Sequence, residues 1–170
     1  MRVNRQFFNR NTVLVAKELL GKILVRKIGN KIIRSRITET EAYCGPKDLA
    51  CHASKGLTER TKVMFGPPGH SYIYMIYGMY HCLNIVTEKE GFPSAVLIRA
   101  TNLENCGGPG KLCRELKIDR KLNGKDLISS REIWIEDGGE LIRPSEIKRS
   151  KRIGVEYAGK WKDKLWRFSL

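Results

Sequence analysis

A cluster of tyrosines constrains the fold of this chain more than any other feature. Four of the six tyrosines fall within nine residues, at positions 72, 74, 77 and 80. The preceding Pro67-Pro68-Gly69 interrupts regular structure, and residues 71–76 have the β-branched and aromatic composition of a strand. Gly78 can adopt the positive φ of a tight turn, and residues 81–87 read as the returning strand. The sequence therefore predicts a β-hairpin with an aromatic tip.

The tyrosines themselves allow two interpretations. Aromatic side chains suit half-buried strands, so a hairpin of this kind commonly belongs to a core. Tyr77, however, lies beside the predicted turn, where a core residue has little cover, and the surrounding chain is strongly basic. A tip that contacts a partner is the alternative, and the hairpin alone does not decide between the two.

Charge narrows the class of partner. The chain has 170 residues, of which 41% are hydrophobic, so residues 1–170 are expected to form one domain with a real core. Its 32 Lys and Arg against 18 Asp and Glu give a net charge of +14. A surplus of that size favours a polyanion such as DNA, RNA or an acidic membrane surface. A ribosome-like or merely soluble basic protein is the remaining alternative.

The five cysteines indicate a reducing compartment. Their number is odd, no two are separated by only two residues, and the N-terminus carries no signal peptide. No apolar run approaches the ~20 residues needed to span a bilayer. We therefore expect a soluble intracellular protein with reduced thiols and no membrane partner.

The remaining elements predict an α+β domain. Asn11 or Thr12 should cap a helix that ends at Gly21. A turn at Gly29-Asn30 should join two strands, and residues 44–64 have the composition of a long loop that is functional or contains a short helix. Residues 94–100 read as a strand buried on both faces, and the glycine-rich residues 107–110 either hold an anion at a helix start or simply break the chain. The other expected elements are strands at 22–28, 31–41, 131–136, 141–144 and within 160–168, and a helix at 111–116. The strand within residues 160–168 allows two interpretations. Its tryptophans pack on one face while basic residues on the other contact phosphates, or the tryptophans belong to the core and the lysines around them are merely solvated.

Two acids mark the end of the second predicted strand. Strict alternation would place Glu39 and Glu41 on one face together with Ile33, Ser35 and Ile37. Solvated acids at an edge are the ordinary interpretation, but a carboxylate facing a cleft could activate water as a general base. The histidines and cysteines lack the spacing of zinc sites, and no phosphate-binding or dinucleotide fingerprint occurs. No cofactor and no metal is expected.

At these residues the chain resembles a known family. The pattern is Glu39-Thr-Glu-Ala-Tyr43, then Asp48, Ala50 and His52, then the tyrosine hairpin through Asn84, and further Leu97-Ile-Arg99-Ala100, Gly108-Pro-Gly-Lys-Leu-Cys113, Arg152-Ile-Gly-Val155 and Trp161. It covers nearly the whole chain in order, and it is similar to that of the alkyladenine (3-methyladenine, methylpurine) DNA glycosylases. The resemblance implies a single compact α+β domain: a curved, mainly antiparallel sheet surrounded by helices, with a protruding hairpin that intercalates into DNA.

The resemblance also implies roles for individual residues. Glu41 matches the general base that deprotonates the attacking water, and Arg99 matches the arginine that helps hold that water. Glu39 is assigned to structure. The family also places a backbone carbonyl near the water, close to Val155. The base-pocket residues implied are Tyr43, His52, Tyr74 and Asn84, and Tyr77 matches the wedge that fills the gap left by the flipped nucleotide.

The expected activity is that of a monofunctional base-excision-repair glycosylase without lyase activity. Its partner would be double-stranded DNA containing damaged purines, and the protein is expected to be a monomer of a prokaryote. Because the chain between Ala100 and Gly107 looks shorter than in larger family members, we expect phosphate contacts from Arg60, Lys62, Lys111 and the C-terminal basic run. A non-catalytic binder of structured RNA or damaged DNA, and a metal-dependent nuclease or deaminase, are the rival hypotheses.

Overall fold

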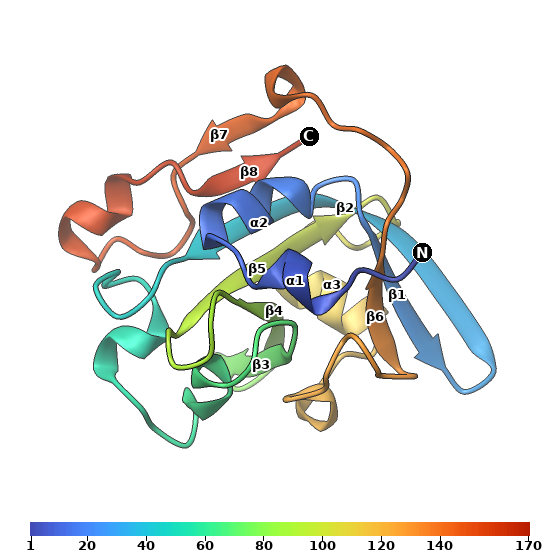
Figure 1. Cartoon of the computed structure of the whole chain (residues 1–170), viewed down its shortest axis with the longest axis horizontal. Coiled ribbons are helices and arrows are strands. Elements are labelled where there is room, and N and C mark those ends of the chain that lie inside the picture. The colour runs from blue at the N-terminus through green and yellow to red at the C-terminus, as the bar shows by residue number, and fades with distance from the viewer.

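The sheet is organised around one long strand, β2 (Lys31–Tyr43). We describe all of residues 1–170 from a computed structural model of the chain. A tight turn at Gly29 lets β1 (Ile23–Ile28) pair antiparallel with the first half of β2. The second half of β2 pairs with β5 (Ser94–Thr101) on one side and with β8 (Arg167–Ser169) on the other. The end of β2 is thus enclosed by strands, whereas its beginning extends outward at the right of Figure 1.

The remaining strands extend this curved sheet. The main path runs β3-β4-β5-β2-β1-β6, and β7 pairs with β8 beside it. Every pairing is antiparallel, as predicted. The strands added to the sheet in this way are β3 (Ser71–Ile76), β4 (Tyr80–Thr87), β6 (Ile133–Glu136) and β7 (Lys148–Ser150).

Three short α-helices lie against the sheet. The first two are α1 (Arg5–Phe8) and α2 (Thr12–Glu18), and they lie over the sheet on the near side in Figure 1, with α3 (Pro109–Glu115) farther from the viewer. Asn11 caps α2 as expected: its side chain accepts from the N–H groups of Val13 and Leu14. None of the helices is long and apolar enough to cross a bilayer. Short 3-10 helices occupy His52–Lys55, Lys62–Phe65, Arg120–Leu122, Pro144–Glu146 and Gly159–Asp163.

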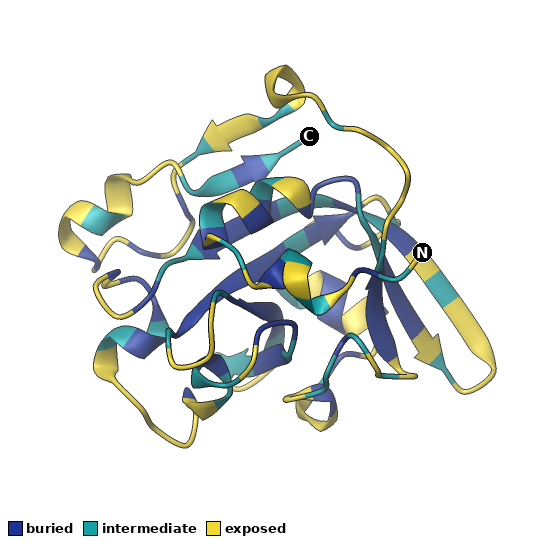
Figure 2. Cartoon of the chain, in the orientation of Figure 1, coloured by how far each residue is buried: buried dark blue, intermediate teal, exposed yellow.

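One main core lies beneath these helices. It contains apolar side chains from α1, α2, α3 and strands β1 to β6 and β8, and the buried parts of these strands are dark in Figure 2. β5 is buried on both faces except at Arg99, as its continuous apolar run predicts. A smaller apolar cluster joins Tyr72 and Met64 under the hairpin, and a third joins Ala50, Val155 and Ala158. The smaller clusters border the site described below.

The predicted facing of the β2 side chains is wrong beyond Ile37. Ile37 and Ala42 belong to the same core cluster although they are five positions apart, an odd offset that strict alternation would place on opposite faces. Thr40 likewise donates to the Ala16 carbonyl in α2. Irregularities in the pairing with β5, between Ile37 and Glu39 and again between Glu39 and Thr40, account for this change. A bulge moves the following side chains to the opposite face. Glu41 therefore faces away from the core face that holds Ile37, which strict alternation cannot predict.

Four other predictions need correction. Residues 141–143 form no strand: Leu141 is 90% exposed, and Pro144, which lacks an N–H, starts a 3-10 helix. The predicted last strand is shorter because Trp161 and Trp166 pack at 6.0 Å, which a continuous strand would forbid for residues five apart. The basic run contains an unpredicted strand, β7, at the sheet edge. Helix α3 begins at Pro109 rather than at 111, since proline fits the first helical position.

Candidate active site

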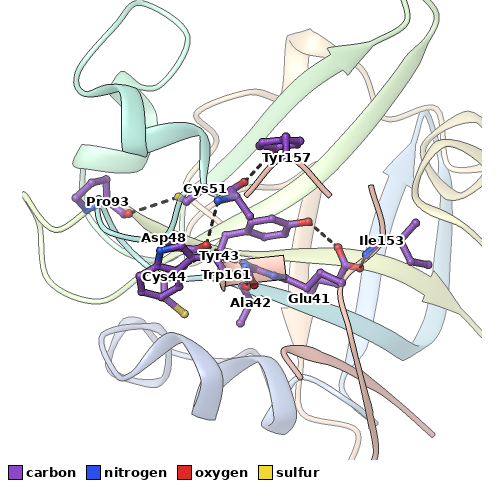
Figure 3. A network of polar contacts seen from close by, with 12 residues as sticks. Glu41, Ala42, Tyr43, Cys44, Asp48, Cys51, Pro93, Ile153, Tyr157 and Trp161 are labelled. Atoms are coloured by element: carbon purple, nitrogen blue, oxygen red, sulfur yellow. Dashed lines mark hydrogen bonds and ion pairs between the residues drawn. The ribbon is translucent and has the colours of Figure 1, made fainter. Parts of the chain in front are cut away.

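The Glu41 carboxylate is the most unusual polar group in the chain. It is fully buried near the end of β2 and yet belongs to the lining of a cavity of about 590 Å³. One oxygen, Oε1, accepts from the Ile153 N–H at 2.8 Å, and the other, Oε2, accepts from the Tyr43 hydroxyl at 2.7 Å (Figure 3). Burial raises the pKa of Glu41, and Arg99, Tyr43 and Ile153 oppose that rise. The carboxyl group is thus buried at the edge of a cavity, with two hydrogen-bond donors, Tyr43 and Ile153, and the Arg99 charge beside it.

Arg99 on β5 lies between the two acids. Its Nε donates to Glu39 at 2.9 Å, while a terminal nitrogen is 3.6 Å from the Glu41 carboxylate. Glu39 also accepts from Arg167 on β8 at 3.2 Å. Glu39 is therefore an ion-pair partner of two arginines, and Glu41 is the acid that faces the cavity.

Two tyrosines wall the same cavity. Tyr43 comes from the end of β2 and Tyr74 from β3, and both rings line the space beside Glu41. Burial, reinforced by Glu41 for Tyr43 and by Cys82 for Tyr74, raises the pKa of both hydroxyls well above the ordinary value. Both phenols are neutral at physiological pH. Each side chain therefore presents an apolar ring face to the cavity and carries an uncharged hydroxyl that can donate or accept a hydrogen bond.

His52 begins a 3-10 helix at the edge of this cavity. Its Nδ1 is 3.0 Å from the Tyr72 hydroxyl, and its ring meets the Tyr74 ring edge-on with centroids 4.4 Å apart. Burial, together with the charges of Arg60 and Lys55, lowers the pKa of His52 to about 4. The imidazole is neutral near pH 7 and can offer one N–H and one lone pair.

Asn84 lies deeper than the other predicted pocket residues. It is 3% exposed on β4, and its amide nitrogen donates to the Tyr72 carbonyl at 3.2 Å and the Cys82 carbonyl at 3.4 Å. Together with Tyr43, His52 and Tyr74 it borders a second, small cavity of about 20 Å³. The four predicted base-pocket residues thus come together around one site.

The hairpin tip projects beside the cavity. Tyr77 is 87% exposed and adopts a positive φ of 51°, next to Gly78 at 64°, so the predicted turn is present. Met79 is 65% exposed on the same turn. Tyr72 is buried in the lower part of the hairpin, so the core interpretation of the tyrosine cluster holds for that part and not for the exposed tip.

The three predicted phosphate contacts do not form one group. Arg60 lies at the cavity edge, with its guanidinium carbon 5.3 Å from the Tyr74 ring centroid. Lys62 pairs with Glu59 at 2.7 Å on the exposed face of the neighbouring loop. Lys111 is exposed on α3. Only Arg60 is adjacent to the candidate active site.

Arg152 and Asp48 support this site, although neither residue has a role that the sequence alone indicates. Both side chains are fully buried, and they form an ion pair at 2.6 Å across 104 residues. Arg152 also donates to the Ala42 carbonyl, between Glu41 and Tyr43. Both residues occur in the family pattern, but no local motif indicates that they meet. Val155, placed near the water only by resemblance, does line the cavity.

Comparison with known proteins identifies the family of the chain. The family described as "Methylpurine-DNA glycosylase (MPG)" matches residues 6–170. A relative from Methanocella arvoryzae is 49% identical over 182 aligned residues, covering 96% of this chain and 90% of the relative. One from Legionella pneumophila (strain Lens) is 54% identical over 173, covering 98% and 92%. Both carry the name "Putative 3-methyladenine DNA glycosylase". The chain therefore belongs to the methylpurine-DNA glycosylase family, whose enzymes are hydrolases that act on N-glycosyl bonds in DNA.

Proposed function

We propose that this chain excises alkylated or deaminated purines from duplex DNA by hydrolysis, leaving an abasic site. Candidate substrates are 3-methyladenine, 7-methylguanine, hypoxanthine and ethenoadenine. One observation carries the proposal: a buried carboxylate, Glu41, lies at the edge of a cavity walled by two tyrosine rings. A base inside a duplex must be extruded before such a site can reach it, and damaged pairs resist extrusion least.

In the proposed reaction, Glu41 is the general base. A water bound to its carboxylate would attack C1′ of the deoxyribose, and Glu41 would accept the proton as the bond to the base breaks. Each oxygen already accepts one hydrogen bond, from Ile153 or Tyr43, and an ionised carboxylate retains further lone pairs for water. Arg99, 3.6 Å from the carboxylate, would help hold that water.

The proposed base site uses the faces of Tyr43 and Tyr74. A purine methylated at N3 or N7, such as 3-methyladenine or 7-methylguanine, carries a positive charge, which makes it a good leaving group and attracts it to aromatic rings. His52 would donate to the base at the cavity edge, as a neutral imidazole. Asn84 would clash with the 2-amino group of guanine, which favours adenine-like lesions over 7-methylguanine. Discrimination would thus come from charge and shape, with few base-specific hydrogen bonds.

The proposed duplex contact is the hairpin tip. Tyr77, largely exposed, would fill the space that the extruded nucleotide leaves, and stacking of this kind contributes about 1–3 kcal/mol per base. The net charge of +14 would hold the phosphates through counterion release, so binding should fall steeply with salt. We propose that residues 1–170 act as one catalytic domain and as a monomer.

Excision without strand cleavage is the last part of the proposal. A glycosylase with lyase activity requires an amine that forms a Schiff base with the sugar. The cavity lining contains two arginines, Arg60 and Arg99, and no lysine. We therefore expect the product strand to remain intact until alkali is added, and borohydride to trap no covalent complex.

The decisive experiment uses short duplexes, each with one damaged purine. Wild-type protein should produce abasic sites, and Glu41→Gln should reduce the single-turnover rate by at least about 10²-fold, because a general base supplies about 10²–10⁴. Glu39→Gln is the matched control two residues away, and it should retain far more activity. Full activity of Glu41→Gln would remove the mechanism.

Other outcomes separate the rival functions. Tight binding of damaged duplex without excision by the wild-type protein would indicate a non-catalytic binder. Loss of excision on adding EDTA would indicate metal-dependent chemistry. The proposal expects excision that is unchanged by EDTA and confined to damaged purines.

A further inference from the structure

Arg152 is a buried cation beside the candidate active site. Its two terminal nitrogens donate to both carboxylate oxygens of Asp48, at 2.6 and 2.9 Å, and both side chains are 0% exposed. The same nitrogens donate to the Ala42 carbonyl at 2.9 Å and the Trp161 carbonyl at 3.1 Å. One guanidinium therefore connects the end of β2, the loop after it and two parts of the C-terminal segment.

The guanidinium also lies between two aromatic rings. Its central carbon is 4.8 Å from the centroid of Tyr43 and 5.1 Å from that of Trp166. A planar, delocalised cation can stack on aromatic faces while its edge donates hydrogen bonds, which the ammonium of lysine cannot do. Tyr43 is thereby supported by Arg152 while it also lines the cavity.

The residue after Arg152 completes the arrangement. The Ile153 N–H donates to Glu41 Oε1 at 2.8 Å, and Glu41 directly precedes Ala42, whose carbonyl accepts from Arg152. The segment is therefore fixed to β2 at two adjacent points, one of them the carboxylate itself. Figure 3 shows Asp48, Tyr43, Glu41 and Ile153 in one network.

We infer that Arg152, held by Asp48, is a positioning residue that sets both the Glu41 carboxylate and the Tyr43 wall of the base site. This inference rests on the proposed function of that site. Arg152 acts through Tyr43 and the Ile153 N–H. Displacing its guanidinium would loosen the donor on Glu41 and the support behind Tyr43 together.

The effect on Glu41 has a defined direction. The groups that face the carboxylate are Tyr43 on β2, Arg99 on β5, Tyr74 and Cys82 on the hairpin, and Arg152 with Ile153 on the C-terminal segment. Arg99, Tyr43, the Ile153 N–H and the Arg152 charge all favour the anion, and the last two belong to the segment that Arg152 holds. A looser Ile153 contact stabilises the anion less, so the pKa of Glu41 rises and the base is protonated at a higher pH.

The test is the pH dependence of single-turnover excision by the full chain. Arg152→Lys keeps the charge but cannot donate to four acceptors and stack on two rings. We expect the acid limb of its profile to move up by about one pH unit, which slows excision about tenfold at any pH on that limb. Asp48→Asn, nearly the same shape, should move the limb in the same direction and provides a second variant where lysine prevents folding.

Arg26→Lys is the matched control. Arg26 is also a buried arginine, and it donates to the Leu116, Lys117, Lys27 and Glu132 carbonyls, but it lies on β1 and does not line the cavity. The Arg26→Lys substitution should lower the melting temperature and leave the acid limb of the pH profile of excision in place.

The possible results separate the two claims. Acid limbs for Arg152→Lys and Asp48→Asn that coincide with that of the wild-type protein, in folded variants, would overturn the positioning role and leave the proposed function standing. Absence of excision by the wild-type protein on every damaged duplex would overturn both. A shifted limb in Arg152→Lys with an unmoved limb in Arg26→Lys supports the inference.

Discussion

Two walls of the cavity are built on opposite principles. The hairpin wall, β3 and β4, consists of residues that are neighbours in the sequence, and its tip exposes Tyr77 and Met79. The C-terminal wall around Arg152 depends on partners more than 100 residues away and is completely buried at its centre. One wall is set by local turn chemistry and the other by a single long-range ion pair.

The two walls differ in what they can do: the exposed hairpin tip can contact a partner, whereas the buried ion pair can only support the fold. An exposed aromatic side chain on a short turn is free to meet a partner and contributes little to the fold. A buried ion pair cannot meet a partner, and its loss leaves an uncompensated charge in the interior. Substitutions at the hairpin tip should therefore affect the binding of DNA, whereas substitutions at Arg152 or Asp48 should affect both the stability of the fold and the rate of excision.

The largest expected effect comes from removing the ion pair at the centre of the C-terminal wall. Asp48→Ala leaves the Arg152 cation buried with no counter-charge, which costs about 3–5 kcal/mol of unfolding free energy. Chemical denaturation measures this loss directly. The matched control is Glu59→Ala, whose acid is exposed and pairs with Lys62 at the surface, and it should leave the unfolding free energy unchanged. Equal stability of the two variants would contradict the contrast between the walls.

The next largest effect comes from removing the exposed ring at the tip of the hairpin wall. Tyr77→Ala removes an exposed ring, so the melting temperature should stay constant while excision at limiting substrate falls by about tenfold or more, in line with one stacking contact. Tyr77→Phe keeps the ring and should behave like the wild-type protein. Unchanged turnover in Tyr77→Ala would show that the tip does not enter the duplex.

The local wall was largely predictable from the sequence, for physical reasons. Gly78 and the flanking β-branched and aromatic residues specify a hairpin through backbone preferences that act over a few residues. The Asn11 cap and the doubly buried β5 follow from equally local rules. Residues 141–143 misled the prediction because a short apolar run is a strand only when another strand pairs with it.

The candidate site was predictable only in part. The family pattern drew together Glu41, Tyr43, His52 and Tyr74, and the structure places them around one cavity. Alternation alone put Glu41 on the wrong face, because no simple sequence rule locates the bulge in β2. The ion pair between Asp48 and Arg152 joins two separate loops, and no short-range pattern encodes such a contact.

A smaller effect tests how firmly the hairpin wall is seated. Gly110 lies inside α3, and a Cβ there would come within 2.9 Å of the Tyr80 ring and 3.2 Å of the Tyr80 Cβ. Gly110→Ala gains about 0.5–1 kcal/mol of helix preference but introduces an overlap that costs about 1–3 kcal/mol. We expect a net loss of about 1 kcal/mol in denaturation, with slower excision because the hairpin shifts. Gly107→Ala, which has open space around it, is the control. A more stable Gly110→Ala with normal excision would show that the hairpin base accommodates the methyl group freely.

The smallest effect concerns the pH dependence of His52, which packs against the hairpin wall. His52 has a folded-state pKa of about 4, lowered first by burial and then by Arg60 and Lys55, against about 6.5 in an unfolded chain. Between these values the unfolded state binds the additional proton, so the stability that neutral His52 contributes is complete above pH 6.5 and is lost as the pH falls towards 4. Denaturation at pH 7 and pH 5 should show His52→Asn losing about 1 kcal/mol less than the wild-type protein over this interval, after allowance for the partial exposure of the ring. Because the two proteins differ only at position 52, the difference between their losses reports the titration of His52. Parallel losses in the two proteins would mean that His52 is solvated and does not pack against Tyr72 and Tyr74 as the structure has it.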